Sequence, residues 1–279
     1  PAVERGAHVR AAGHDTRAGD EVRLPAEPLS AAGIGVLASL GIGTLAVRRR
    51  PRVAILSTGD ELRPPGEPLA PGQIHDANSF ALAAAVEEAG GEPVRLPTVA
   101  DDRSAVEAAL RSGIAAADLL VASGGVSVGR HDHVRDAMGA MGRLEFWRIA
   151  VQPGKPLAFG SIDGRPVLGL PGNPVSALVT FELFVRPLLR AMLGLTGSGR
   201  VRLPACATER MAKDRERRAY LRVVVEAGAD GLRARPAGGQ ASSQLRPLAA
   251  GNGLLIVPEG EEAAEAGRSY PVLLLGALA

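Results

Sequence analysis

The sequence is poor in aromatic residues, in cysteine and in long apolar runs. Aromatic residues make up 3% of the 279 residues, and the net charge at pH 7 is only +2. This composition argues against a nucleic-acid partner, because such binders concentrate positive charge and often add stacking aromatics. The one cysteine, Cys206, excludes an internal disulfide and is in keeping with a reducing, cytoplasmic location. Arg or Gly breaks every apolar stretch well before the roughly 18 residues that a membrane span needs, so we expect no membrane association.

Three regions differ in pattern along the chain. Residues 1–48 mix Gly, Pro and charged residues, with one short apolar helix, and alone could not bury a core. Residues 49–196 alternate apolar strands with helices of ten or so residues, which predicts an α/β fold: a mostly parallel wound sheet with helices on both faces. Residues 197–279 contain short strands separated by Gly-rich turns, which predicts a small all-β domain.

Local signals predict the boundaries of several elements. Ser104 and Glu107 have the spacing of a capping box that opens a helix. Asp163-Gly164 lies between two apolar runs and predicts a hairpin turn. Asn173 is expected to be the N-cap of a long helix with Pro174 at its first position, and Pro187 should unwind this helix locally.

Polar loops follow four of the predicted strands. They span residues 57–62, 101–102, 123–129 and 170–176. In open parallel sheets, ligands bind at the carboxyl ends of the strands. Two of these loops are glycine-rich turns that lead into helices, where backbone N–H groups can converge on an anion. A pair of such turns predicts a ligand that carries more than one phosphate-like group.

Four carboxylates, Asp60, Glu61, Asp101 and Asp132, would lie beside this anion site. Carboxylates repel phosphates unless a divalent cation lies between them, and hard oxygen ligands suit Mg²⁺. We therefore expect a magnesium site here. An alternative for Asp101 and for its neighbour Asp102 is that they cap the helix that follows.

Other candidate residues have simpler explanations. Lys155 lies in a turn stiffened by two prolines and could present its charge to an oxyanion, although a loop lysine is usually just solvated. His131 and His133 flank Asp132, but no third or fourth zinc ligand is near in sequence. The run from Arg48 to Arg50 is typical of a solvated linker.

The polar loops, taken in order, resemble those of the molybdopterin molybdenumtransferases, the family that includes bacterial MoeA and the gephyrin E domain. The most specific strings are Ser57 to Leu62 with Gly72-Gln73-Ile74 downstream, Ser123 to Gly129, Pro153 to Pro156, and Leu170 to Ala177. The resemblance implies a MogA-like molybdopterin-binding domain followed by the β domain, with residues 1–48 as a remnant of N-terminal domains. It also implies a molybdenum insertase, in which magnesium-dependent cleavage of adenylyl-molybdopterin releases AMP as molybdate is inserted.

The resemblance assigns roles residue by residue. The implied catalytic residues are Glu61, Asp101, Asp132 and Lys155, and the implied metal ligands are Asp60, Glu61, Asp101 and Asp132. The implied substrate-binding residues are Thr58, Gly59, Asp60, Ser123, Gly124, Gly125, Val126, Ser127, Arg148, Gly154, Pro156, Pro171, Gly172, Asn173, Pro174, Ser176, Arg217 and Ser242.

The family also implies partners. Members form homodimers with shared clefts, and Arg10 and Asp15 match positions that approach the partner's cleft. A molybdopterin adenylyltransferase would act one step earlier in the pathway. Gln152 stands where some members carry a second lysine. The family's N-terminal domains are missing, which leaves open whether the chain is active alone, and the sequence does not separate molybdenum from tungsten.

Two rival interpretations remain open. The adenylyltransferases and the nicotinamide-nucleotide amidases of the competence-damage type share the α/β module, but they generally have a Gly-Gly-Thr-Gly loop where this chain has Gly124 to Ser127, and they lack the β tail. A scaffold role, such as gephyrin's anchoring of receptors, would be an addition to the enzyme rather than a replacement.

Overall fold

The computed structural model describes residues 2–25, 27–126, 132–195, 197 and 199–279. The chain divides into two units, Pro1–Val47 and Arg48–Ala279. The first unit contains α1 (Ala31–Ser39), which begins where the Ser30 hydroxyl accepts a hydrogen bond from the Gly33 N–H at 3.1 Å. Gly33 is the one buried residue of this helix. In the described part of the chain, no helix has the length and apolar character needed to cross a bilayer.

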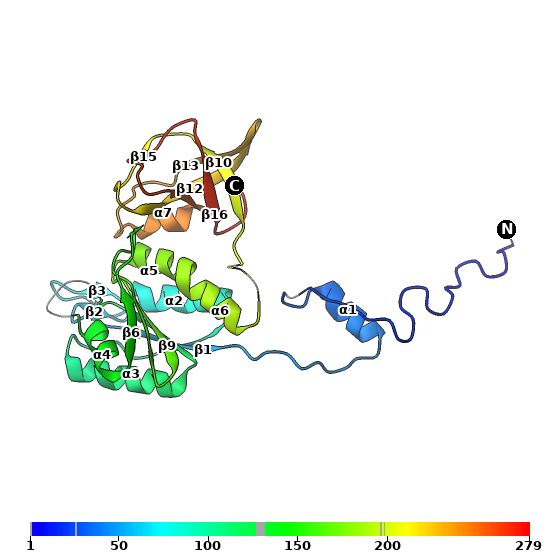
Figure 1. Ribbon diagram of the computed structural model, residues 1–279, viewed down its shortest axis with the longest axis horizontal. Coiled ribbons are helices and arrows are strands. Elements are labelled where there is room, and N and C mark those ends of the chain that lie inside the picture. The colour runs from blue at the N-terminus through cyan, green and yellow to red at the C-terminus, as the bar shows by residue number, and fades with distance from the viewer. Residues whose placement is uncertain (1, 26, 127–131, 196, 198) are drawn as a thin grey trace. The chain divides into compact units, whose positions relative to one another are not determined.

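The second unit begins with a sheet of six strands in the order β4-β1-β5-β9-β8-β6. Strands β1, β6 and β9 of this sheet are labelled in Figure 1. The strands are β1 (Arg52–Ser57), β4 (Glu92–Arg95), β5 (Leu119–Ser123), β6 (Arg143–Trp147), β8 (Ala158–Ile162) and β9 (Arg165–Leu170). Strands β4, β1, β5 and β9 pair in parallel, whereas β8 pairs antiparallel with both β9 and β6. The predicted wound sheet, mostly parallel, is therefore confirmed.

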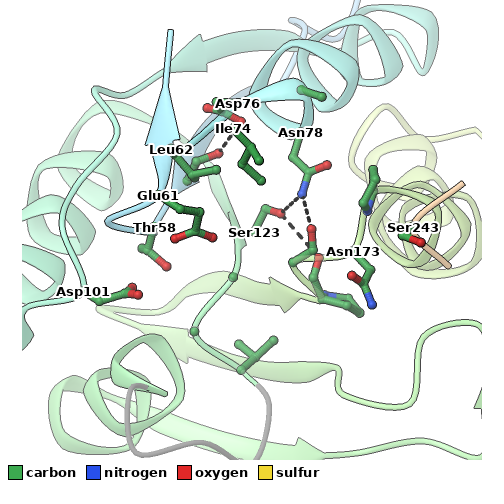
Figure 2. A pocket seen from close by; sticks show the side chains of 18 of the residues that line it. Thr58, Glu61, Leu62, Ile74, Asp76, Asn78, Asp101, Ser123, Asn173 and Ser243 are labelled. Carbon is green, nitrogen blue, oxygen red and sulfur yellow. Dashed lines mark hydrogen bonds between the residues drawn. The ribbon is translucent and has the colours of Figure 1, made fainter. Parts of the chain in front are cut away.

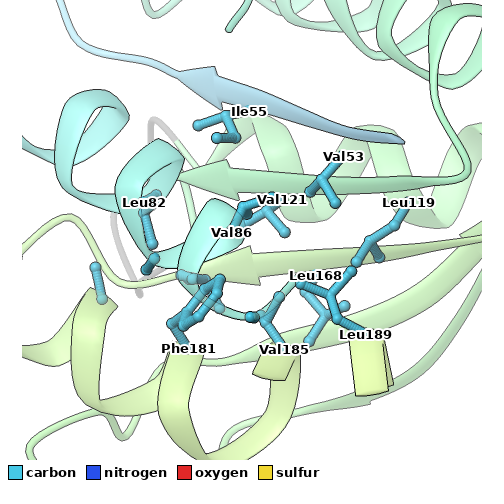
Figure 3. Packing of buried hydrophobic residues seen from close by; sticks show 14 of the residues in the cluster. Val53, Ile55, Leu82, Val86, Leu119, Val121, Leu168, Phe181, Val185 and Leu189 are labelled. Carbon is cyan, nitrogen blue, oxygen red and sulfur yellow. The ribbon is translucent and has the colours of Figure 1, made fainter. Parts of the chain in front are cut away.

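Helices cover both faces of this sheet. The helices are α2 (Ala77–Glu88), α3 (Arg103–Ala116), α4 (His133–Met141), α5 (Pro174–Thr180) and α6 (Arg186–Met192). Val53 and Ile55 of β1 pack with α2, α5 and α6, as Figure 3 shows. Ala54 and Leu56 point the other way and pack with α3 and α4. Because both faces are buried, the strands are nearly continuous apolar runs, as parallel strands usually are.

The capping box predicted at the start of α3 is wrong. The N-cap is Asp102, whose carboxylate accepts hydrogen bonds from the Ala105 N–H at 2.9 Å and from the Ser104 hydroxyl. Glu107 pairs with Arg103 one turn away instead of reaching back to the cap. The alternative considered for Asp102, a helix cap, is thus correct.

The long C-terminal helix of the α/β domain is interrupted as Pro187 predicted. Between α5 and α6 lies a π-helical segment, η1 (Phe181–Val185). Proline has no N–H to donate and clashes with the carbonyl of the preceding turn, so the helix widens before it. The predicted hairpin between β8 and β9 is also present, with positive φ angles at Asp163 and Gly164.

The C-terminal region forms a second sheet. Its strands, in spatial order, are β13 (Gly231–Pro236), β10 (Arg202–Ala207), β16 (Ser269–Leu274), β14 (Gly253–Val257), β12 (Arg218–Gly228) and β7 (Val151–Gln152). Strand β7 precedes β8 in the chain, yet it pairs with β12. The sequence predicted neither the place of β7 in this second sheet nor the short helix α7 (Leu245–Ala250) that lies beside β12.

The arginine run at the start of the second unit is not simply solvated. Arg49 donates two hydrogen bonds to the Asp118 carboxylate, both at 2.6 Å. The Arg52 N–H also donates to Asp118. The Arg49 guanidinium, more than any other group, lowers the pKa of Asp118 to about 2. The expectation of a merely solvated linker is therefore wrong for Arg49.

Candidate functional site

Four loops meet at the carboxyl ends of neighbouring strands, as the sequence predicted. The Thr58 N–H donates to the Ser123 carbonyl at 3.2 Å, and the Gly124 N–H donates to the Leu170 carbonyl at 3.1 Å. The Gly59 N–H donates to Val99 at 3.2 Å, which joins the loop after β1 to the segment before Asp101. The loops that follow β4, β1, β5 and β9 are thus joined to one another by backbone hydrogen bonds.

Thr58 and Gly124 come into direct contact at the centre of this edge. A Cβ atom at Gly124 would lie 2.8 Å from the Thr58 carbonyl oxygen and 2.9 Å from its hydroxyl oxygen. Gly124 also has a φ of +100°, which L side chains rarely adopt. Glycine is therefore required here for the two loops to approach so closely.

Asn78, near the start of α2, links two of the loops (Figure 2). Its side-chain amide donates to the Ser123 hydroxyl at 2.8 Å and to the Gly172 carbonyl at 2.7 Å. The Ser123 hydroxyl in turn donates to the Pro171 carbonyl at 3.4 Å. One amide group therefore bridges the Ser123–Val126 loop and the Pro171–Asn173 loop, just beyond the last residue pair of β5 and β9.

The loops enclose a pocket of about 830 Å³, a size suited to a nucleotide or a comparable small molecule. Its described lining residues are Ser57, Thr58, Glu61, Leu62, Ile74, His75, Asp76, Ala77, Asn78, Asp101, Ser123, Gly124, Gly125, Val126, Asp132, Pro156, Pro171, Gly172, Asn173, Pro174 and Ser243. Most come from the α/β domain, and Ser243 comes from the β domain.

The described lining of the pocket is acidic. It includes the carboxylates of Glu61, Asp76, Asp101 and Asp132 and contains no lysine or arginine. Asp76 is a structural residue, because its buried carboxylate caps α2 at the Ser79 N–H and accepts from the Ser57 hydroxyl. The other three are the acids that the sequence singled out. A phosphorylated ligand in this pocket would need a cation beside it.

The carboxylates of the pocket fit a magnesium ion whose coordination is completed by waters and by the phosphates of a bound substrate. Among the described residues, no three His, Cys, Asp or Glu side chains lie close enough to enclose a metal. The expected set of four carboxylates is thus not assembled as one cluster. Magnesium, however, usually binds through one or two carboxylates, with waters and substrate phosphates filling the remaining positions. Glu61 and Asp101 line the same pocket and could serve in this way.

The hydroxyl of Thr58, in the wall of the pocket, is a hydrogen-bonding group without a partner among the described residues. The side chain is 6% exposed, and its Oγ1 has no hydrogen-bond partner among the described residues. Buried hydroxyls are normally hydrogen-bonded, since an unsatisfied one costs about 1 to 3 kcal/mol. The hydroxyl is therefore an unsatisfied group just beneath the surface of the pocket.

The structure brings many of the predicted site residues together. Those that line the pocket are Thr58, Glu61, Asp101, Ser123, Gly124, Gly125, Val126, Asp132, Pro156, Pro171, Gly172, Asn173 and Pro174. Those that are described but not in its lining are Gly59, Asp60, Arg148, Gly154, Lys155, Ser176, Arg217 and Ser242.

Several residues outside the lining have other partners. Asp60 accepts a hydrogen bond from the Asp101 N–H at 3.1 Å, so it supports the acid loop. A Cβ atom at Gly59 would lie 2.6 Å from the Glu61 carboxylate, which would have to turn away. The exposed Arg148 stacks on the Trp147 ring at 3.9 Å from its centroid. Lys155 is exposed on the turn before Pro156.

The predicted residues of the β domain lie near its contacts with the α/β domain. The Ser242 hydroxyl accepts a hydrogen bond from the Asn173 amide at 3.0 Å. This use of its side chain explains why Asn173 makes no side-chain cap at α5. Arg217 pairs with Asp214, whose N–H donates to the Gln152 side chain at 2.8 Å. Gln152 therefore supports the Arg217 turn.

Some predictions fall elsewhere. Ser127 and His131 lie outside the described residues. Arg10 and Asp15 are exposed in the first unit. Of the residues that line the pocket, eight were not among the predicted site residues: Ser57, Leu62, Ile74, His75, Asp76, Ala77, Asn78 and Ser243. Asp76 and Asn78 lie one to three residues before Ser79, where an apolar helical pattern begins, in the position typical of an N-cap, and this signal could have placed both at the strand ends.

Comparison with known proteins identifies the two domains of the second unit. Residues 54–191 match the family described as "Probable molybdopterin binding domain", and residues 204–275 match the "MoeA C-terminal region (domain IV)". Molybdopterin molybdenumtransferase 2 of Mycobacterium tuberculosis is 41% identical over 273 residues, which cover 96% of this chain and 67% of the relative. The chain belongs to the molybdopterin molybdenumtransferase family. The match to the MoeA C-terminal region also sets the chain apart from the rival enzymes expected to lack a β tail.

Other members of the family agree in sequence and in fold. The molybdopterin molybdenumtransferase of Nostoc is 38% identical over 90% of this chain and 59% of its own length. The solved structure of the molybdopterin biosynthesis MoeA protein of Pyrococcus horikosii has a TM-score of 0.79 at 34% identity, over 90% of this chain and 61% of that one. The chain thus spans about two thirds or less of the length of these relatives.

Proposed function

We propose that the chain inserts molybdenum into adenylyl-molybdopterin, with cleavage of the pyrophosphate link and release of AMP. The observation that carries the proposal is the pocket at the carboxyl ends of β4, β1, β5 and β9, in which glycine-rich turns face acidic side chains. The names of the relatives support the transfer of molybdenum to molybdopterin. Because the relatives are longer, the activity of the whole protein stays a proposal for this chain.

The described loops contact different parts of the substrate. The turn from Ser123 to Val126 binds phosphate oxygens through backbone N–H groups other than that of Gly124, which donates to the Leu170 carbonyl. The close approach of Gly124 to Thr58 leaves no side chain in the way. The Thr58 hydroxyl supplies a further donor. Asn173 and Pro171, on the opposite wall, position the rest of the ligand.

The acids of the pocket position a cation against the pyrophosphate. Magnesium, when bound, neutralises phosphate charge and stabilises the leaving AMP. Glu61 and Asp101 would hold it, while Asp60 keeps the Asp101 backbone in place. Asp132, buried at the start of α4, adds a third carboxylate to the same pocket.

Molybdate would enter from the β-domain side. The expected positive charges are Lys155, Arg148 and Arg217, with Pro156 and Ser242 beside them. Pro156 lines the pocket, and Ser242 is bound to Asn173, which also lines it. A homodimer in which Arg10 and Asp15 reach the partner's cleft, and delivery of substrate by a molybdopterin adenylyltransferase, belong to the same proposal.

The direct test is an assay of AMP release from adenylyl-molybdopterin with magnesium and molybdate. We would compare this chain with a version extended at its N-terminus by the segment that the longer relatives carry. Release that depends on molybdate in either form supports the proposal. No release from either form, at a protein concentration where the pocket is occupied, would contradict it.

Variants then test the carboxylates. Glu61→Gln and Asp101→Asn keep the size of each side chain but remove a charge that can hold a cation. We expect turnover to fall at least about tenfold and the magnesium requirement to rise, with unchanged melting temperature. Glu262→Gln, on the surface of the β domain, is the control. Normal turnover in both pocket variants would remove these acids from the reaction.

A further inference from the structure

A buried arginine in the β domain holds the loop that carries Ser242 and Ser243 to the pocket. Arg222, in β12, is 1% exposed and is among the largest fully buried side chains. Among the described residues, no carboxylate lies within ion-pair distance of its guanidinium. Its Nε also has no hydrogen-bond partner there. Burying an unpaired charge is costly, so the position calls for an explanation beyond packing.

The hydrogen bonds of Arg222 go to a single loop. Its Nη2 donates to the carbonyls of Gly239 and Ala241, at 2.8 and 3.1 Å. From the other side, the Gln240 side chain accepts from the Arg222 N–H at 2.9 Å and donates to the Arg222 carbonyl at 3.0 Å. Three successive residues of the loop are thus fixed to one residue of β12.

The next two residues of this loop reach the pocket. Ser242 accepts from the Asn173 amide, and its carbonyl accepts from the Val175 N–H at 3.2 Å. Ser243 lines the pocket itself (Figure 2). Since two residues of extended chain span at most about 7 Å, the loop cannot move far at Ala241 without moving Ser243.

The face of β12 that carries Arg222 points toward the α/β domain. Side chains alternate along a strand, and Leu221, Val223 and Val225 pack in the core of the β domain. Tyr220, on the face of Arg222, packs instead against Val175 of α5. Arg222 therefore lies on the side of the sheet from which the pocket is built.

We propose that Arg222 is a positioning residue: its guanidinium Nη2 holds the 239–243 loop so that Ser242 and Ser243 complete the wall of the substrate pocket. The inference rests on the proposed function for its effect on substrate, but not for its effect on the loop. A lysine at this position would keep the charge, but its ammonium group ends one bond nearer the backbone than Nη2 and should not reach both carbonyls.

The experiment compares Arg222→Lys and Arg222→Met with the wild-type chain. Amide hydrogen exchange of residues 240–244 reports the loop without any ligand, and titration with adenylyl-molybdopterin reports the pocket. Loss of two hydrogen bonds predicts exchange at least about tenfold faster in both variants and binding weaker by a similar factor.

Two further variants keep the test decisive. Val225→Ala removes core packing from the same strand and lowers stability, but it should leave loop exchange and binding unchanged. Gln240→Ala removes the hydrogen bonds between the Gln240 side chain and the backbone of Arg222. Position 240 is partly exposed, so this variant should fold even if the Arg222 variants do not, and it should speed amide exchange in the loop.

The outcomes separate this inference from the proposed function. If wild-type protein fails to bind adenylyl-molybdopterin, the proposed function fails, and the exchange data still decide the role of Arg222. Wild-type exchange and affinity in Arg222→Met would overturn the inference, since the loop would then keep its place without a donor at this position. Equal loss of binding in Val225→Ala would overturn it too, because general destabilisation would explain the effect.

Discussion

The amide of Asn78 donates to the hydroxyl of Ser123 at 2.8 Å, and this bond joins α2 to the loop that follows β5. The same amide donates to the Gly172 carbonyl, so one side chain spans two walls of the pocket. Strands β5 and β9 pair as far as Ser123 and Leu170, and Asn78 bridges the two loops just beyond this pair. The spacing of the loops is therefore reinforced by a side chain that is not itself a candidate for the chemistry.

Asn78→Ala should weaken substrate binding with little effect on folding. Two hydrogen bonds are lost, at about 1 kcal/mol each, so the affinity for adenylyl-molybdopterin should fall by roughly ten- to thirtyfold. Calorimetric titration measures the loss, and a thermal melt checks stability. Asn78→Asp is the matched comparison, since it keeps the shape but cannot donate, and it should bind as weakly as the alanine variant. Wild-type affinity in both would show that the loops keep their spacing without Asn78.

Thr58→Val should have opposite effects on stability and on binding. The Thr58 hydroxyl is buried without a partner, so replacing it by a methyl group should leave the melting temperature of the ligand-free chain unchanged or raise it. If the hydroxyl binds a phosphate oxygen, substrate affinity should fall about tenfold or more.

The control for Thr58→Val is Ser79→Ala. The Ser79 hydroxyl is also buried without a partner among the described residues, but Ser79 is not in the pocket lining. We expect it to share the effect on stability and to leave substrate affinity unchanged. Equal substrate affinity in the wild-type chain, Thr58→Val and Ser79→Ala would show that the ligand does not bind the Thr58 hydroxyl.

The mostly parallel wound sheet and the edge at which the loops meet could be predicted, because both follow from local patterns. Parallel strands buried on two faces are apolar throughout, and the polar residues that follow each strand must then gather at one edge. Thr58, Ser123 and Asn173 were found in this way. Their place in the pocket needed no knowledge of side-chain contacts.

Residues whose role depends on contacts between distant segments could not be predicted. The pairing of β7 with β12 joins positions 151 and 218, and nothing in either segment marks the other as its partner. Ser243 enters the pocket only because Arg222 and Asn173 hold its loop from two sides. The arrangement of the acids depends in the same way on Asp60, which turned out to support the Asp101 backbone.

A buried ion network should make stability depend on pH through Glu182. Its carboxylate, in the π-helical segment η1, binds Arg186 at 2.8 Å and Arg200 at 2.9 Å. Burial raises the pKa of Glu182, but hydrogen bonds from Arg200 and Arg186 outweigh it and hold the pKa below its ordinary value. Glu182→Gln removes this charge and leaves the half-exposed Glu88 as the remaining carboxylate beside both arginines among the described residues. It should therefore lower the free energy of unfolding at pH 7, by at most about 3 to 5 kcal/mol.

The sign of the pH effect follows from this lowered pKa. Because the folded state favours the ionised carboxylate, its contribution is present above the unfolded pKa of about 4.3 and is lost as the pH falls through the folded value. Urea unfolding should show the largest deficit of Glu182→Gln at pH 7 and a shrinking one below about pH 4. Glu226→Gln removes an exposed partner of Arg235 and should cost less than about 1 kcal/mol at either pH. A deficit that is independent of pH would mean that the charge of Glu182 is not what stabilises the fold.

Trp147 should control the shape of the phosphate-binding turn. Its indole N–H donates to the Val126 carbonyl at 2.9 Å, and Val126 lines the pocket. The guanidinium groups of Arg148 and Arg135 lie 3.9 and 4.7 Å from the ring centroid, which holds the indole in place. Trp147→Phe keeps a ring for both arginines but removes the donor, so substrate affinity should fall by about five- to tenfold, as expected for one lost hydrogen bond.

Trp147→Ala also removes the ring, and a larger loss in that variant would measure the contribution of the arginine stack. Because the chain has a single tryptophan, the emission of the wild-type protein reports this site alone. Unchanged emission on saturation with substrate, together with unchanged affinity in Trp147→Phe, would show that the turn is fixed by its backbone and not by the indole.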